Sequence, residues 1–403
     1  MNSPFYTHEP ISELDGIKKY TAYNYYWGIN KREDIQRFIK EARSLGFTDA
    51  ESLYWTNDKN KTYTNQWDRA SFHFFLPISY DAVVLDLGSG YGNNTIPLAK
   101  YYGRVVAADA TLELLQYTAL RAASEGLTNV DFVNIDPLEF CNLPFKPHSF
   151  DAIIVSGLLE WVGSALPDVS PATLQQRVLT HLRTLLKSDG VLYIGIENRW
   201  FPGYVRRDPH TKLPYTCVLP RFLANIYAKR HGLPLGYKTY VHSSRTYTKM
   251  LKVAGFGEIA YAFPHPNYRN PSSIYTNDSE IDGYLYSENN LDRLYTHRWT
   301  TFLRIMRPLR LHHFFLSSFI FIASAERGST IPSLIRRAVE QGIQGVELSD
   351  KMMRIPELKN PKEMARFALF HQGQAKPYGY LYAKHNPVNS DDVRLNFTDS
   401  TTL

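Results

Sequence analysis

One stretch, VVLDLGSGYG over residues 83–92, constrains the fold of this chain more than any other. Its first three residues are apolar, as in a central parallel strand that is covered on both faces. Asp86 ends this strand, and Gly88, Gly90 and Gly92 follow in a loop. Because glycine lacks a Cβ atom, the loop can turn tightly and lie against a ligand before a helix begins. The stretch therefore predicts a buried strand, a ligand-binding loop and a helix in succession.

A second predicted strand, residues 105–108, ends in Asp109, about twenty residues after the glycine loop. An acid at this spacing accepts hydrogen bonds from both hydroxyls of a ribose, which also suits a nicotinamide dinucleotide. Two details favour a different cofactor. Asn93 stands where the dinucleotide fingerprint has its third glycine, and Asp86 precedes the loop.

The strand, loop and acid resemble motif I and the following acidic motif of class I S-adenosylmethionine-dependent methyltransferases. Two more strands are predicted over residues 130–135 and 150–155. In that family the end of the first contacts the adenine, and the end of the second closes over the methionine part. The resemblance thus implies S-adenosylmethionine as the cofactor. The predicted contacts are Asp86, Gly88, Ser89, Gly90, Gly92, Asp109, Ala110, Asp136, Pro137, Ser156 and Gly157.

Apolar stripes at helical spacing alternate with these strands, as a doubly wound sheet requires. Further strands are predicted over residues 191–196, 258–263 and 314–323. The resemblance implies that the last of them is antiparallel. The expected fold class is therefore α/β, with a doubly wound, seven-stranded, Rossmann-like methyltransferase sheet.

With 403 residues, the chain exceeds the usual size of one domain. We expect a helical N-terminal cap (1–79), a methyltransferase core (80–325) and a C-terminal extension with a hairpin and a mobile tail (326–403). Two insertions in the core, 199–240 and 264–313, are expected to form the acceptor pocket. The aromatic run Tyr23, Tyr25, Tyr26 and Trp27 in the cap is interpreted as a packing patch rather than a substrate contact.

The sulfonium methyl is already activated, so the protein must align an acceptor and, for a hydroxyl, remove its proton. Residues 159–163 and 197–210 resemble segments of bacterial O-methyltransferases from surface-polysaccharide and natural-product clusters. From that resemblance we nominate His210 as base, because imidazole titrates near neutral pH, with Asp208 as its partner. The alternatives for the base are Glu160, His242 and His265. No compact ligand motif is evident, so no metal is predicted.

Cys141 and Cys217 are the only two cysteines, which excludes a disulfide framework or a zinc cluster and suits a reducing cytoplasm. The longest apolar run, residues 314–325, is too short to span a bilayer, and no apolar signal core is evident. We therefore expect a soluble, cytoplasmic protein without a membrane span. The sequence does not predict an oligomeric state.

The net charge of +6 permits contact with anions, and both insertions are rich in Lys and Arg. An anionic acceptor such as a phosphorylated or uronic sugar would explain them, although a solvated basic surface is the simpler interpretation. The sequence contains no block of Lys and Arg residues that would indicate nucleic-acid binding, so a nucleic-acid partner is not expected. The fourth strand is followed by neither Asp/Asn-Pro-Pro-Tyr nor Pro-Cys, which disfavours base methylation. We predict methyl transfer to a hydroxyl of a sugar-containing or other small polar acceptor. An RNA or protein methyltransferase and a non-catalytic cofactor-binding subunit stay open as alternatives.

Overall fold

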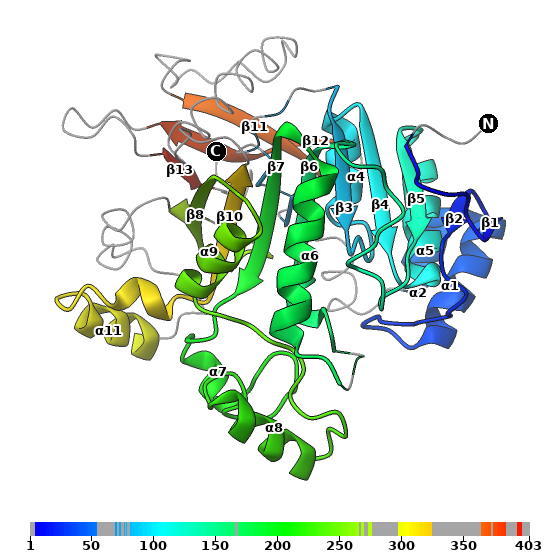
Figure 1. The fold of residues 1–403 in the computed structure, drawn as a ribbon. Coiled ribbons are helices and arrows are strands. Elements are labelled where there is room, and N and C mark those ends of the chain that lie inside the picture. The colour runs from blue at the N-terminus through cyan, green and yellow to red at the C-terminus, as the bar shows by residue number, and fades with distance from the viewer. Residues whose placement is uncertain are drawn as a thin grey trace.

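The computed structural model describes most of the chain up to residue 324 and three later strands. The described residues are 5–54, 69–70, 72–73, 76, 78, 81–164, 166, 168–265, 267–269, 273–275 and 297–324, with the backbone of 364–371, 374–383 and 393–396. Figure 1 shows a twisted sheet with helices packed against its two faces.

The centre of the sheet contains the seven strands that the sequence predicts. In spatial order they are β5 (Val130–Asn134), β4 (Arg104–Asp109), β3 (Val83–Leu87), β6 (Phe150–Ser156), β7 (Leu186–Glu197), β10 (Ser318–Ser324) and β8 (Glu258–His265). The first five pair in parallel, whereas β10 is antiparallel to both of its neighbours. The expected α/β fold with a parallel-dominated sheet and an antiparallel last strand is confirmed.

Successive residues of each strand point to opposite faces, so the apolar strands bury two separate layers. Leu85 and Ile153 pack with helices α6 (Pro171–Leu185) and α9 (Ser244–Val253) on one face. Val84 packs on the other face, towards helix α4 (Thr95–Tyr101). Helix α5 (Leu112–Ser124) packs against β4 and β5. This arrangement brings the carboxyl ends of five parallel strands to one edge of the sheet.

The N-terminal cap, which was expected to be mainly helical, begins with two short strands. Strands β1 (Ser12–Leu14) and β2 (Ile17–Lys19) form a hairpin, and β2 extends the sheet by pairing in parallel with β5. The cause is the dipeptide Asp15-Gly16, whose φ angles of 55° and 76° suit the tight turn that joins two antiparallel strands. The expected helices follow as α1 (Arg32–Leu45) and α2 (Phe47–Tyr54).

The start of the first insertion lies beside the end of the second. The first contains α7 (Gly203–Arg206) and α8 (Arg221–Arg230), which lie together below the carboxyl end of β7 (Figure 1). The second contains β9 (Ser273–Tyr275), α11 (His297–Met306) and a 3₁₀ turn, His312–Phe315. Asn198, directly after β7, donates side-chain hydrogen bonds of 2.7 Å to the carbonyls of Phe314 and Leu316. It therefore ties the start of the first insertion to the end of the second.

The start of the last strand of the core differs from the sequence-based prediction. The strand expected to begin at residue 314 begins at Ser318, because residues 312–315 form the 3₁₀ turn.

In the C-terminal extension, β11 (Met364–His371) and β12 (Gln374–Ala383) pair as an antiparallel hairpin, and β13 (Val393–Asn396) joins β12 to β9. The polar tail beyond residue 396 lies outside the described residues. In the described part of the chain, no helix has the length and apolar character needed to cross a membrane.

Candidate active site

A pocket opens at the carboxyl ends of β3, β4, β5 and β6, where an open α/β sheet binds its ligands. It is lined by Tyr25, Trp27, Gly88, Gly90, Asp109, Ala110, Thr111, Ile135, Pro137, Phe140, Gly157, Leu158, Trp161, Gly163, Ser164 and Leu166. Six of the predicted cofactor contacts lie in this lining: Gly88, Gly90, Asp109, Ala110, Pro137 and Gly157. The strand ends chosen from the sequence thus converge on a single cavity.

Two of the lining glycines allow a close approach of the backbone to a ligand. Gly90 has φ +53° with open space where a Cβ atom would stand. Gly157 has φ +70°, and a Cβ atom there would lie 2.5 Å from the hydroxyl of Tyr268 and 2.7 Å from Nη2 of Arg69. A side chain at position 157 would therefore strain the backbone and displace both neighbours.

Asp109 joins the glycine loop to the end of β4. Its carboxylate accepts backbone hydrogen bonds of 2.9 Å from Gly90 and 2.8 Å from Thr111. Burial raises the pKa of Asp109, and these hydrogen bonds oppose that shift. Each carboxylate oxygen has a second lone pair, so Asp109 can hold the loop and still accept hydrogen bonds from a ribose.

Asp86 lies beneath the pocket instead of lining it. The residue is fully buried, and Thr95 at the start of α4 donates a hydrogen bond of 2.6 Å to its Oδ2. Burial raises the pKa of Asp86 to about 6. The geometry shows a side chain that fixes the strand to the following helix.

Four other predicted contacts are also absent from the lining. Ser89, Gly92 and Ser156 are packed behind it, and Ser156 accepts hydrogen bonds from the Arg69 side chain. Asp136 accepts a hydrogen bond of 2.9 Å from the backbone of Leu138, as a turn residue does. Its neighbours Ile135 and Pro137 reach the pocket instead.

Aromatic side chains from the cap form part of the pocket wall, which the sequence analysis did not favour. Tyr25 and Trp27 line the pocket, whereas Tyr26 packs against the cap helices and Tyr23 is exposed. The Trp27 ring meets Trp161 edge-on, with 5.1 Å between ring centroids. The packing interpretation therefore fits only part of this run.

A buried cluster of ionisable side chains lies behind Trp161. The ring of His210 meets that of Trp161 edge-on at 5.2 Å between centroids. Nε2 of His210 lies 3.7 Å from Oε1 of Glu160 and 3.9 Å from Oε2 of Glu197, and its Nδ1 lies 3.5 Å from Oδ1 of Asp208. The structure thus brings together all three predicted catalytic residues and adds Glu197.

The loop of the first insertion fixes His210 in this cluster. Oδ1 of Asp208 accepts backbone hydrogen bonds from His210 and Thr211, and its Oδ2 accepts one of 2.8 Å from the Thr216 hydroxyl. Sequence reasoning missed Glu197, the last residue of β7. A strand-end acid, the signal that identified Asp109, also marks Glu197.

The electrostatics of the cluster differ from the expectation for a free imidazole. Burial alone would lower the pKa of His210, but Asp208, Glu160 and Glu197 outweigh it and raise the pKa to about 10. Burial would raise the pKa of Asp208, yet hydrogen bonds from His210 and Cys217 lower it to about 2. The assumption that His210 titrates near neutral pH therefore does not hold in this structure, where its imidazole carries a proton at pH 7.

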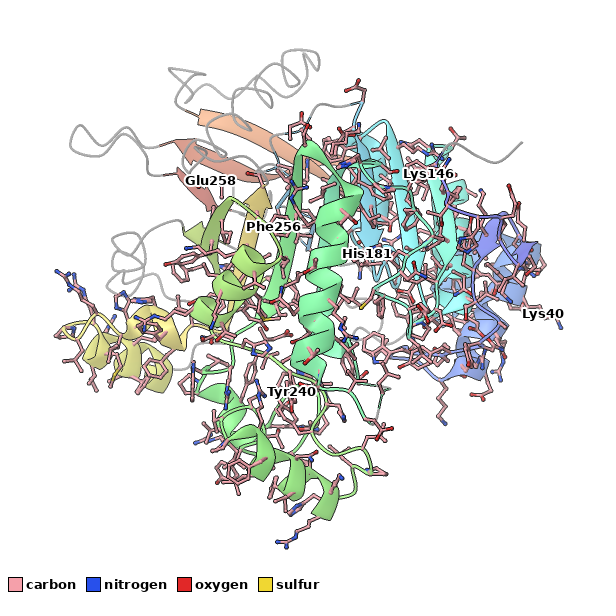
Figure 2. The ribbon with its side chains drawn as sticks, viewed as in Figure 1. Lys40, Lys146, His181, Tyr240, Phe256 and Glu258 are labelled. Atoms are coloured by element: carbon pink, nitrogen blue, oxygen red, sulfur yellow. The ribbon has the colours of Figure 1, made fainter. Side chains whose placement is uncertain are left out.

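His242, one of the two alternative histidines, does not share this site. His242 is buried, Nε2 lies 2.8 Å from Oε1 of Gln175, and burial lowers its pKa to about 3. His265 is the last residue of β8, and its side chain lies outside the described residues. Tyr240, labelled in Figure 2 near the N-terminal end of α6, accepts a hydrogen bond of 2.8 Å at its carbonyl from Gln175. These contacts anchor the return of the first insertion to α6.

Comparison with known proteins gives partial matches. Over 146 residues the chain is 34% identical to a 23S rRNA (uracil(1939)-C(5))-methyltransferase of Haemophilus influenzae, which covers 36% of this chain and 28% of that protein. The chain thus spans less than a third of the length of this relative. Among solved structures it resembles phosphoethanolamine N-methyltransferase 2 of Haemonchus contortus in complex with S-adenosyl-L-methionine (14% identity, TM-score 0.39, 72% of this chain and 60% of that one). It also resembles the [4+2]-cyclase SpnF (17% identity, TM-score 0.39, 65% of this chain and 81% of that one).

The first part of the predicted core matches a family of known proteins. The matched segment begins in β3 and ends in β7, so it contains the glycine loop, Asp109 and Glu160. Residues 84–190 of this chain match the family model of a methyltransferase domain.

Proposed function

We propose that this protein is an S-adenosylmethionine-dependent methyltransferase that methylates a hydroxyl of a sugar-containing or other small polar acceptor. The observation that carries the proposal is the pocket at the carboxyl edge of the sheet, lined by Gly88, Gly90 and Asp109 within the matched methyltransferase domain. The ribose would bind at Asp109, and the methionine part would lie along the backbone of Gly88 and Gly157.

Transfer to a hydroxyl needs a group that takes its proton, and the cluster behind Trp161 supports this chemistry. A sulfonium in the adjacent pocket would repel the proton on His210 and lower its pKa towards neutrality. His210 would then accept the acceptor's proton, with Asp208 orienting the ring and Glu160 stabilising the imidazolium that forms. The C–S bond of the cofactor breaks as the new C–O bond forms, which leaves S-adenosylhomocysteine and the methyl ether.

The rRNA methyltransferase relative favours RNA as a second candidate acceptor. Covalent catalysis at C5 of uracil needs a reactive thiolate. Cys217 is buried and its Sγ lies 2.8 Å from the Oδ2 of Asp208, and both burial and this acid raise the pKa of the thiol. Burial also raises the pKa of Cys141. Neither of the two cysteines supports uracil C5 chemistry, so an RNA acceptor would be methylated at another atom.

Calorimetric titration with S-adenosylhomocysteine, S-adenosylmethionine and a nicotinamide dinucleotide tests the cofactor. Micromolar binding of the two sulfur compounds and none of the dinucleotide is expected. Transfer of a labelled methyl group is then measured on sugar nucleotides, glycolipid extracts and ribosomal RNA. Preference for the dinucleotide would reject the proposal. Cofactor binding without transfer to any of these acceptors would support the non-catalytic alternative.

A further inference from the structure

We propose that Glu160, Glu197 and His210 bind a divalent transition-metal ion. Their potential ligand atoms, two carboxylate oxygens and one imidazole nitrogen, all lie within 4.8 Å of one another. Among the described residues, no other group of three His, Cys, Asp or Glu side chains has its potential ligand atoms this close together. Glu160 comes from the turn after β6, Glu197 from the end of β7 and His210 from the first insertion.

Burial without hydrogen bonds is the second observation that points to a ligand. The side chains of Glu160, Glu197 and His210 are 0%, 5% and 2% exposed. Both oxygens of Glu160, Oε2 of Glu197 and Nε2 of His210 are buried and make no hydrogen bond. Buried carboxylate oxygens normally have partners, because leaving them unpaired costs considerable free energy. A cation between them would satisfy these atoms together.

The spacing fits an ion better than a set of direct hydrogen bonds. The distances of 3.7 and 3.9 Å from Nε2 of His210 to the two carboxylates exceed the usual hydrogen-bond range of about 2.7–3.2 Å. Two ligands that each lie about 2.0–2.2 Å from a shared ion are separated by a gap of this order.

The surrounding contacts leave the required atoms available. Tyr268 and Arg269 donate hydrogen bonds to Oε1 of Glu197, so its Oε2 faces His210. Asp208 faces Nδ1 of His210 at 3.5 Å, so Nε2 faces the two glutamates. A carboxylate behind a histidine in this way orients the ring and increases its basicity as a metal ligand.

Charge and ligand type indicate which ion fits. Glu160, Glu197 and Asp208 carry three negative charges and Arg269 one positive charge, so a divalent ion with neutral His210 makes the cluster neutral. A nitrogen ligand favours Zn²⁺, Co²⁺ or Mn²⁺ over Mg²⁺ and Ca²⁺, which prefer oxygen ligands alone. Three protein ligands leave a further coordination position. Binding of an acceptor hydroxyl at that position rests on the proposed methyl transfer, whereas the ion site itself does not. With the ion on Nε2, His210 could not take the proton as base, and the ion would acidify the hydroxyl in its place.

Metal titration of chelator-treated full-length protein tests the site. Saturable binding of one Zn²⁺ or Co²⁺ per chain is expected, with Co²⁺ absorption bands that show a nitrogen and oxygen ligand set and with weaker binding of Mg²⁺. His210→Ala and Glu197→Gln should each weaken Zn²⁺ binding at least about tenfold, and Asp208→Asn by about 10- to 100-fold. His242→Gln and Glu113→Gln remove a comparably buried histidine and glutamate outside the cluster and should leave binding unchanged.

Folding of each variant is checked by circular dichroism and by S-adenosylhomocysteine binding, which depends on Asp109 and not on the ion. If one variant fails to fold, the other cluster variants and the Co²⁺ spectrum of the unmodified protein still decide the matter. Absence of saturable binding, or equal Zn²⁺ affinity in unmodified protein, His210→Ala and Glu197→Gln, would overturn the proposal. The cluster would then be an ion-pair network around a protonated histidine. A failure of methyl transfer with intact Zn²⁺ binding would reject only the proposed function.

Discussion

Nε2 of His210 lies 3.7 Å from Oε1 of Glu160, although His210 belongs to the first insertion and Glu160 follows β6. The pairing exists because the insertion starts at the end of β7, beside β6 in the sheet. The first insertion thus places the imidazole of His210 against the ring of Trp161, and Trp161 lines the predicted cofactor pocket.

Asp109→Asn should weaken binding of S-adenosylhomocysteine about 10- to 100-fold, or about 1.4–2.8 kcal/mol. The amide has one acceptor oxygen, so it cannot both hold the backbone of Gly90 and Thr111 and accept from the ribose hydroxyls. Isothermal calorimetry measures the change. Asp131→Asn, which removes an acid paired with Arg104 on the neighbouring strand, is the control and should bind normally. Equal affinities for the two variants would contradict this role of Asp109.

Gly157→Ala should impair cofactor binding more than it impairs folding. Gly157 lines the pocket, an added Cβ atom there would meet the Tyr268 hydroxyl and Arg69, and φ +70° disfavours alanine. Calorimetry and thermal unfolding together separate the two effects. Gly126→Ala, with φ +70° but open space around it, is the matched control for backbone strain. Similar binding losses in both variants would show that the contacts at position 157 are unimportant.

Asp86→Asn should stabilise the cofactor-free protein at pH 7 by about 1–3 kcal/mol. Burial raises the pKa of Asp86 from its ordinary value of 3.8 to about 6 in the fold, so the folded state binds more protons than the unfolded state between these pH values. Its contribution to stability is therefore lost as the pH rises from about 4 to 6. Urea unfolding across this range measures the effect, which should vanish below pH 4. A destabilised variant at pH 7 would mean that the charged form is held by contacts stronger than its desolvation.

His242→Gln should make the protein less sensitive to acid. Burial lowers the pKa of His242 from its ordinary value of 6.5 to about 3, so the unfolded state binds more protons than the folded state between these pH values. Stability from the neutral, buried ring is present above pH 6.5 and falls with decreasing pH by about 1.4 kcal/mol per unit. When the free energy of unfolding is measured from pH 7 to 4, its dependence on pH should be smaller in the variant by the amount that one proton contributes. His8→Gln at an exposed position is the control.

The sheet was predictable because its evidence is local. Each strand is an apolar run, and the turn after β3 is marked by three glycines. The strand-end rule selected Asp109, which lines the pocket, and also Asp136, which is absent from the lining and accepts a backbone hydrogen bond as a turn residue does. An acid at a strand end is typical both of a cofactor contact and of a turn residue, so the sequence alone cannot distinguish these two roles.

The group of possible metal ligands could not be predicted from the sequence because its members are distant in the chain. Glu160, Glu197 and His210 have no common spacing motif, and only the pairing of β6 with β7 brings the first two together. The N-terminal hairpin, in contrast, was visible in the sequence. Asp15-Gly16 is a strong turn signal, which was missed because the surrounding strands contain only three residues each.

Asn198 fastens the beginning of one insertion to the end of the other, and Arg199 meets the carbonyl of His242 where the first insertion returns. The first insertion thus leaves at the end of β7 and returns just before α9, whereas the second leaves at the end of β8 and returns just before β10. Because lengthening a closed loop costs little extra entropy, evolution can rebuild either excursion without shifting the register of β7, β8 or β10. A change in either insertion therefore requires no change in the strands that support the predicted cofactor pocket.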